Sequence, residues 1–242
     1  MPSGGAGDGD VNPPLAHIRW PDAVRIIRSI YPASDLFEDI ADPADWPLLI
    51  AAEQKTNPRL METLGNLDLV PPDRRVSGAG ASFLMAPFTH VSRDRHSRLS
   101  DGSYGVLYAG DHFEVALFET MHHHARFMAR TREAAGWTSH FRELTLSIDA
   151  HLHDVRGVGF EAVHDPDDCV ASQSLGQQLR ATTGQGIIYD SVHSPDGHCI
   201  GLFYPDLASK VTQARHLDYH WDGARVDLYR NAGTGEVFRV VW

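Results

Sequence analysis

Apolar residues in the front third of the chain recur at the spacing of an amphipathic helix. Pro21 suits a first helical turn, and the apolar side chains that then fall on one side are Val24, Ile26, Ile27 and Ile30. Asp35 is placed to cap a short helix, and a further helix is broken at Asn57-Pro58. We therefore predict a helical N-terminal extension over residues 15–75, which packs on the following domain or covers a cleft.

From residue 76 onward, short apolar runs alternate with turn signals. The pattern predicts strands over residues 104–109, 143–148, 186–192 and 199–204, and helices over residues 111–128 and 173–180. Asp111 and Glu114 have the spacing of a capping box at the start of the first helix. Ser194-Pro195-Asp196-Gly197 is a turn sequence between two strands, and a terminal hairpin is expected around Gly233. This mixture predicts an α+β fold with mostly antiparallel sheets and flanking helices.

Composition narrows the class of protein. The 242 residues suit one large domain with an extension, and a formal net charge of −11 without a basic stripe argues against direct nucleic-acid binding. Cys169 and Cys199 do not make a disulfide framework, and no run approaches the ~20 apolar residues of a membrane span. Residues 1–14 are glycine-rich and lack the features of a signal peptide, so they predict a disordered lead-in to a soluble, cytoplasmic protein.

Two charged residues stand out because of their surroundings. Arg98 lies in a polar segment just before a predicted strand, and its guanidinium can form two hydrogen bonds to a phosphate or carboxylate, unless it is a solvated loop residue. Glu119 follows four apolar residues in a predicted helix, so we expect its carboxylate to be buried. Glu119 then either forms a buried ion pair, for example with Arg98, or faces a cleft where it stabilises an oxocarbenium-like transition state or holds ribose hydroxyls.

Further candidates are less distinctive. Tyr108 lies inside the predicted strand after Arg98, either as a core residue or with its ring toward a ligand. Ser191 ends a strand just before a turn, and it has neither a G-x-S-x-G motif nor an adjacent base, so a hydrogen-bonding role is favoured over a nucleophilic one. The consecutive histidines at 122–124 point in different directions on a helix and match no zinc motif, so no metal is expected.

Two of these segments resemble a known family, the RES domain, which is named for its Arg, Glu and Ser. The matching segments are SRLSDGSYGVLYAGDHFEVALFET and GIIYDSVHSPDG, and the similarity extends upstream to MAPFTH and downstream through FYPD to ARHLDYHWDGARV. It covers roughly residues 76–229, so residues 76–242 are interpreted as a RES catalytic domain. By this resemblance the arginine is Arg98, the strand tyrosine is Tyr108, the glutamate is Glu119 and the serine is Ser191.

The resemblance implies a fold similar to ADP-ribosyltransferases and the consumption of NAD as a substrate. Such proteins are typically toxins of bacterial toxin–antitoxin pairs with an Xre-like DNA-binding antitoxin. Some act as NAD phosphorylases or glycohydrolases, and others modify a protein with ADP-ribose. Arg98 would then hold the phosphates, Glu119 the ribose and its developing charge, Tyr108 a ring, and Ser191 a hydrogen bond to the site or the substrate.

The chain departs from the family pattern in two places. Leu99 stands where a phenylalanine or tryptophan often follows the arginine, and His193 stands where an arginine often follows the serine. His193 is therefore expected to contribute to substrate binding in place of that arginine. The acceptor of ADP-ribose stays open between phosphate, water and a protein side chain. The rival interpretation is an inactive member that only binds an antitoxin.

Overall fold

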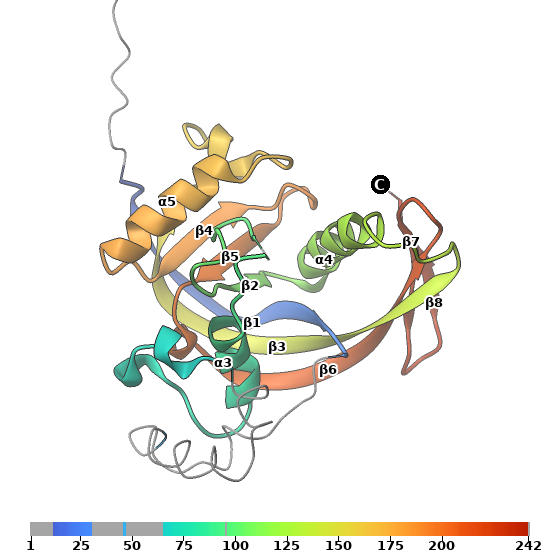
Figure 1. Cartoon of the computed structure of the whole chain (residues 1–242), viewed down its shortest axis with the longest axis horizontal. Helices are drawn as coiled ribbons and strands as arrows, with labels where there is room; N and C mark the ends of the chain where they lie inside the picture. The colour runs from blue at the N-terminus through green and yellow to red at the C-terminus, as the bar shows by residue number, and fades with distance from the viewer. Residues whose placement is uncertain (1–11, 31–45, 47–64, 95, 242) are drawn as a thin grey trace, which may run out of the picture.

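One eight-stranded sheet organises the computed structural model, which describes residues 12–30, 46, 65–94 and 96–241 (Figure 1). The strands are β1 (Leu15–Arg28), β2 (Leu107–Gly110), β3 (Trp137–Asp154), β4 (Gly186–Asp190), β5 (His198–Leu202), β6 (Ala208–Trp221), β7 (Val226–Asn231) and β8 (Val237–Arg239). The α-helices are α3 (Ala81–Thr89), α4 (Phe113–Met128) and α5 (Val170–Ala181). Short 3-10 turns cover Leu67–Leu69, Pro72–Arg74, Glu161–His164 and Pro205–Leu207.

The strand order is β1-β2-β5-β4-β3-β6-β7-β8, with a further pairing between β1 and β3. The pairings therefore close a ring through β1, β2, β5, β4 and β3, and the last three strands extend from β3. β3 and β4 run parallel, and every other pairing in the described part of the chain is antiparallel. The prediction of an α+β fold with mostly antiparallel strands is confirmed.

The front of the chain differs from the sequence-based prediction. Residues 15–28 form the strand β1 and pair along the length of β3, so the predicted helix is wrong there. Pro21 lies where the pairing shifts register, between Trp20 and Ala23, a position at which a missing N–H costs no ladder hydrogen bond. Val24 and Ile26 alternate toward the core and pack with α4. Because residues 15–28 belong to the central sheet, they are not part of a separate extension.

Other predictions for the front of the chain are tested only in part. Residues 1–11, 31–45 and 47–64 lie outside the described residues, and most of the predicted helices fall there. Trp46 is helical and fully buried in the main hydrophobic cluster. The carbonyl of Pro14 accepts a hydrogen bond from the backbone N–H of Asp154, 2.7 Å away. The prediction of a disordered lead-in over residues 1–14 is therefore wrong at Pro14, and residues 1–11 lie outside the described residues.

α4 ends at Met128 as predicted, but its start is built differently. The N-cap is His112, and no side chain caps the helix. The carboxylate of Asp111 instead accepts a hydrogen bond from the backbone N–H of His198 at 3.1 Å. The predicted capping box is therefore wrong, because Asp111 joins the start of the helix to β5. Val115 and Met121, both fully buried, fix this helix on the sheet.

α5 approaches the segment that carries Arg98 very closely. Gly176 on this helix faces the carbonyl of Leu99 and the hydroxyl of Tyr104, and the same hydroxyl donates a hydrogen bond to the Leu99 carbonyl. Leu99 is fully buried in a cluster with β4 and α5 residues. Tyr104 packs into this cluster, and β2 begins at Leu107 and not at residue 104 as predicted. Figure 1 shows α5 beside β4, and α4 lies on the same upper side of the view.

Gly176→Ala should lower the free energy of unfolding by about 1–3 kcal/mol, because the added Cβ overlaps a backbone carbonyl that cannot swing away. A drop in Tm of roughly 2–4 °C for each kcal/mol is expected in thermal unfolding. Ser174→Ala, an exposed position on the same helix, is the matched control and should leave Tm nearly unchanged. Equal melting of both variants would show that α5 is not held against the Arg98 segment.

Candidate active site

Arg98 is buried, with 6% of its surface exposed, so the alternative of a solvated loop arginine is wrong. Its Nη1 donates hydrogen bonds to the carbonyls of Val163 and Asp165, each at 3.1 Å. Its own carbonyl accepts a hydrogen bond from Ser172 Oγ at 2.6 Å. Among the described residues, no carboxylate lies within 4 Å of its guanidinium. The guanidinium is therefore held in place without being neutralised.

Tyr108 orients the segment that carries Arg98. Its hydroxyl donates a hydrogen bond to Ser97 Oγ and accepts one from the backbone N–H of Leu99, both at 2.9 Å. Burial raises the pKa of Tyr108 to about 12, so the hydroxyl keeps its proton at neutral pH. Tyr108 also borders a cavity of about 140 Å³ together with Ser97. The hydrogen bonds place Tyr108 beside Arg98, on the residues directly before and after it.

Glu119 is bound to Ser191, not to Arg98. Ser191 Oγ donates a hydrogen bond to Glu119 Oε1 at 2.7 Å. Glu119 Oε2 lies 3.8 Å from His123 Nε2, one helical turn further along α4. The Glu119 side chain is 14% exposed, so its carboxylate is largely withdrawn from water, as the apolar helix sequence predicts. The suggested ion pair with Arg98 is not formed.

Ser191 follows β4 and fixes the turn into β5. Its Oγ accepts hydrogen bonds from the backbone N–H groups of His193 and Ser194, at 3.3 and 3.0 Å. The N–H of Gly197 donates to the carbonyl of Ser194, which confirms the predicted turn. One hydroxyl thus organises the turn and binds the Glu119 carboxylate; the sequence predicted a hydrogen-bonding role for Ser191 but not these partners.

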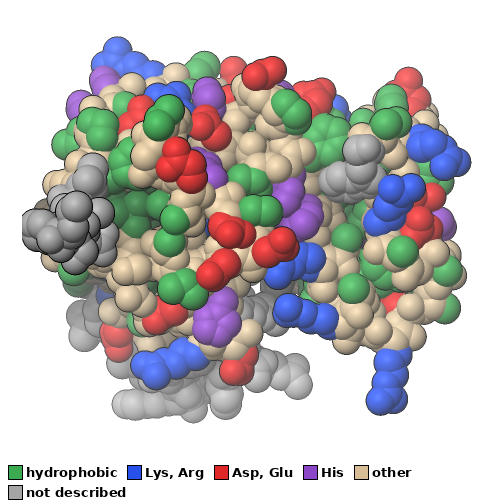
Figure 2. Space-filling view, turned by 90° about the horizontal axis from the view of Figure 1, so that it is seen from above, with side chains coloured by type: hydrophobic (Ala, Val, Ile, Leu, Met, Phe, Trp, Pro, Cys, Tyr) green, Lys and Arg blue, Asp and Glu red, His purple; other side chains and the backbone are tan. Residues whose placement is uncertain are grey.

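Three histidines surround this pair. The rings of His122 and His193 stack with centroids 3.7 Å apart and planes inclined by 20°, and His123 meets His193 edge-on at 6.2 Å. The stack puts His193 against α4, a contact that sequence analysis missed. Histidine side chains also gather in the middle of the face shown in Figure 2, among acidic and basic side chains.

Electrostatics connect these histidines with Arg98. Desolvation, the neighbouring His122 and the positive charge of Arg98 lower the pKa of His193 to about 4. Desolvation and the charge of Arg126 lower the pKa of His122, against an opposing effect of Glu119. Both rings are therefore held in the neutral form. Arg98 and Glu119 both act on the pKa of His122, with opposite signs.

Other reactive groups near the site are suppressed. Burial raises the pKa of the Cys199 thiol well above its usual range, so it is not a ready nucleophile. Tyr189 is also buried, and its ring lies 5.9 Å from the Arg98 guanidinium carbon. The sequence pattern did not single out Tyr189, although it lies within the strand before Ser191. The carbonyls of Val163 and Asp165 were missed because a backbone contact has no signature in residue type.

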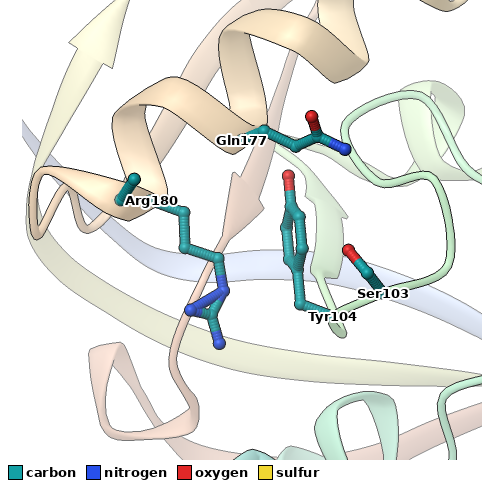
Figure 3. A pocket seen from close by; sticks show the side chains of 5 residues that line it. Ser103, Tyr104, Gln177 and Arg180 are labelled. Carbon is teal, nitrogen blue, oxygen red and sulfur yellow. The ribbon is translucent and has the colours of Figure 1, made fainter.

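The described part of the chain contains other features that bear on ligands. A shallow cavity of about 350 Å³ is lined by Ser103, Tyr104, Gln177, Arg180 and Ala181, none of them a predicted site residue (Figure 3). No group of three His, Cys, Asp or Glu side chains in the described residues is arranged to hold a metal ion. None of the described helices is both long and apolar enough to cross a membrane.

The arginine, glutamate and serine that the sequence singled out come from three separate segments. Glu119 and Ser191 meet directly, and the charge of Arg98 acts on the histidines beside them. The sequence profile of the RES domain matches residues 72–222, well over half of the chain. The chain belongs to the RES domain family. This match confirms the resemblance, and it extends over the segments that carry Arg98, Tyr108, Glu119 and Ser191.

Two further proteins are similar to this RES domain protein. The uncharacterized protein y4oC of Sinorhizobium fredii is 26% identical over 204 residues, which make up 84% of each chain. A solved structure, the M. tuberculosis MbcT-MbcA toxin-antitoxin complex, contains a chain that aligns with a TM-score of 0.43 and 11% identity, covering 84% of this chain and 87% of that one.

Proposed function

We propose that this RES domain protein cleaves the nicotinamide–ribose bond of NAD and passes ADP-ribose to phosphate or water. In that reaction the C–N bond breaks, and nicotinamide leaves with the bonding electron pair. Positive charge develops on the ribose, and an acceptor oxygen then forms a bond to the same carbon while its proton goes to solvent. Catalysis requires a fixed anion beside the ribose and a cation for the phosphates.

The observation that carries the proposal is the Glu119–Ser191 hydrogen bond. A carboxylate that is largely withdrawn from water, and held by a neutral donor, keeps its negative charge available for a developing cation. An arginine partner would have neutralised it. Ser191 is itself fixed by the turn that follows, so the carboxylate oxygen is oriented before a substrate binds.

Arg98 supplies the complementary charge. Nη1 is occupied by two carbonyls, and no carboxylate among the described residues competes for the cation, so the guanidinium is available for the pyrophosphate of NAD. Tyr108 holds the residues on both sides of Arg98 and thereby sets its direction. Tyr108 also offers an aromatic ring near the same site for placing a ring of the substrate.

Family membership supports a toxin-like role in which an Xre-like antitoxin restrains the enzyme in the cytoplasm. An inhibitor that covers Arg98 and Glu119 would prevent NAD from entering. ADP-ribosylation of a bacterial protein is the alternative outcome of the same bond cleavage, since only the acceptor differs. The alternative docking surface is the predicted N-terminal helical region, residues 15–70. Within it, residues 15–28 form strand β1, and residues 31–45 and 47–64 lie outside the described residues.

Incubation of the purified protein with NAD tests the proposal. Nicotinamide release should be measured with and without inorganic phosphate, and the ADP-ribose product identified by mass spectrometry. Phosphorylated ADP-ribose would identify phosphate as the acceptor, and free ADP-ribose would identify water. Transfer of label from NAD to added cell protein would identify a protein acceptor instead. Absence of nicotinamide release under all three conditions would contradict the proposal.

A further inference from the structure

The stacked pair of His122 and His193 has a feature that the proposed reaction does not use. The Nε2 atoms of both rings are buried, and neither has a hydrogen-bond partner in the described part of the chain. A buried nitrogen without a partner costs about 1–3 kcal/mol of desolvation. Two such atoms on stacked rings indicate a site in which a ligand completes the hydrogen bonding.

Two arginines act on the pair and can contribute positive charge to an anion site. Arg98 and Arg126 both act on His193, and both lower its pKa. The two arginines are fixed on neighbouring carbonyls of one loop, because Arg98 Nη1 donates to Asp165 and Arg126 Nη1 donates to Pro166 at 3.3 Å. Both positive charges are therefore held in position by backbone contacts.

Opposing groups also face the pair. Glu119 on α4 and Asp167 on the same loop both raise the pKa of His122, and His123 lies edge-on to both rings. Glu119 is tied to Ser191, so its carboxylate is already engaged. Asp167 follows directly after Pro166, whose carbonyl accepts from Arg126. The charged groups that act on the two rings are therefore two arginines and two carboxylates. Each neutral imidazole can accept a proton and so add positive charge.

We propose that His122 and His193, together with Arg98, form an oxyanion subsite that binds a phosphate-class anion with uptake of protons by the histidine pair. Each imidazole that gains a proton becomes a donor at both nitrogens, so its Nε2 can donate to an oxyanion. The inference rests on the proposed function in one respect: in that reaction the anion is the phosphate acceptor or the pyrophosphate of NAD.

Proton uptake follows from the geometry by linkage. In the free protein, burial and the positive charges of Arg98 and Arg126 lower the pKa of both rings and keep them neutral. A bound anion beside the rings raises their pKa. The pKa of each engaged ring must then rise on binding, so anion affinity is higher at low pH. Affinity should fall by up to tenfold per pH unit for each proton taken up, between the pKa of the free ring and that of the bound ring.

Sulfate is the sharpest probe, since it does not titrate between pH 5 and 8 and all proton uptake is then the protein's own. Calorimetric titration of sulfate in two buffers of different ionisation enthalpy gives both the affinity and the number of protons taken up. His122→Phe and His193→Phe keep a stacking ring and remove the nitrogens, and each should weaken sulfate binding about tenfold to a hundredfold. His140→Phe, at a ring on β3 that is 68% exposed, is the matched control.

The expected result is proton-linked sulfate binding by the wild type and the control, with loss of proton uptake in both site variants. Sulfate binding without proton uptake, or with unchanged affinity in the double variant His122→Phe/His193→Phe, would overturn the subsite. No sulfate binding by the folded wild type would overturn it too. Because no NAD is present, these outcomes are independent of whether the protein turns over NAD.

A second arm identifies which oxyanion the subsite holds. ADP-ribose is titrated into the protein at saturating sulfate and, separately, at saturating inorganic phosphate. Competition would assign the subsite to the pyrophosphate of the substrate, and simultaneous binding would assign it to the acceptor. Either result supports an oxyanion subsite, provided that the affinity again depends on His122 and His193.

Discussion

Replacing Glu119 with glutamine should lower the rate of nicotinamide release from NAD about a hundredfold to a thousandfold, because one preorganised charge-stabilising group is typically worth that much in rate. Glutamine keeps the shape of the side chain and still offers an oxygen to Ser191 Oγ, so the turn after β4 should stay in place. What is lost is the negative charge beside the ribose. The measurement is nicotinamide released per enzyme at saturating NAD.

Glu114→Gln provides the control for this substitution. Glu114 lies on the same helix, is exposed, and makes the same change in net charge away from the site. Its rate should equal that of the wild type, and both variants should unfold at the wild-type Tm. A Glu119→Gln enzyme as fast as the wild type would remove Glu119 from the catalytic machinery.

Arg98→Lys should weaken NAD binding by about tenfold or more, although the charge is conserved. Lysine has one nitrogen, and the carbonyls of Val163 and Asp165 compete for it. The guanidinium has further donors that can form two hydrogen bonds to a phosphate after Nη1 is used. If Arg98 binds the phosphate distal to nicotinamide, affinity for nicotinamide mononucleotide should change less than affinity for NAD.

Calorimetry in the Glu119→Gln background would measure these affinities without turnover. Arg230→Lys is the matched control, since Arg230 is half exposed and pairs with Asp218 on β6. Unfolding curves separate a binding effect from loss of packing, which matters because Arg98 is almost fully buried. Equal NAD affinity with and without the Arg98→Lys substitution would exclude Arg98 from the phosphate site.

Residues 15–28 show how far local pattern can mislead. Val24, Ile26 and Ile27 fit a helical side as well as they fit a strand, and Pro21 suits either a helix start or an irregular strand position. The choice is made by β3, whose residues 141–153 pair with β1 from a distant part of the sequence. A window of neighbouring residues contains no information about that partner.

In the candidate site, too, the sequence predicted individual residues, and the tertiary structure decided their contacts. Arg98, Glu119 and Ser191 could be picked out because each is polar in a local setting that makes polarity costly or useful. The hydrogen-bond partners of these residues could not be predicted from the sequence. Ser191 and Glu119 are 72 residues apart in the sequence, and only the approach of the turn after β4 to α4 joins them. The same approach stacks His193 on His122 and leaves two buried nitrogens without partners among the described residues.

The sequence by itself determined what depends on neighbouring residues: the end of α4, the turn at Ser194–Gly197 between β4 and β5, the terminal hairpin of β7 and β8, and the burial of Glu119. These follow from short-range sterics, turn chemistry and the cost of isolating a charge. The tertiary structure decided which groups meet, because sheet pairing and helix packing join distant segments. It brought Arg98 within hydrogen-bond distance of the carbonyls of Val163 and Asp165, and Ser191 within hydrogen-bond distance of Glu119. The guanidinium and the carboxylate therefore do not pair with each other.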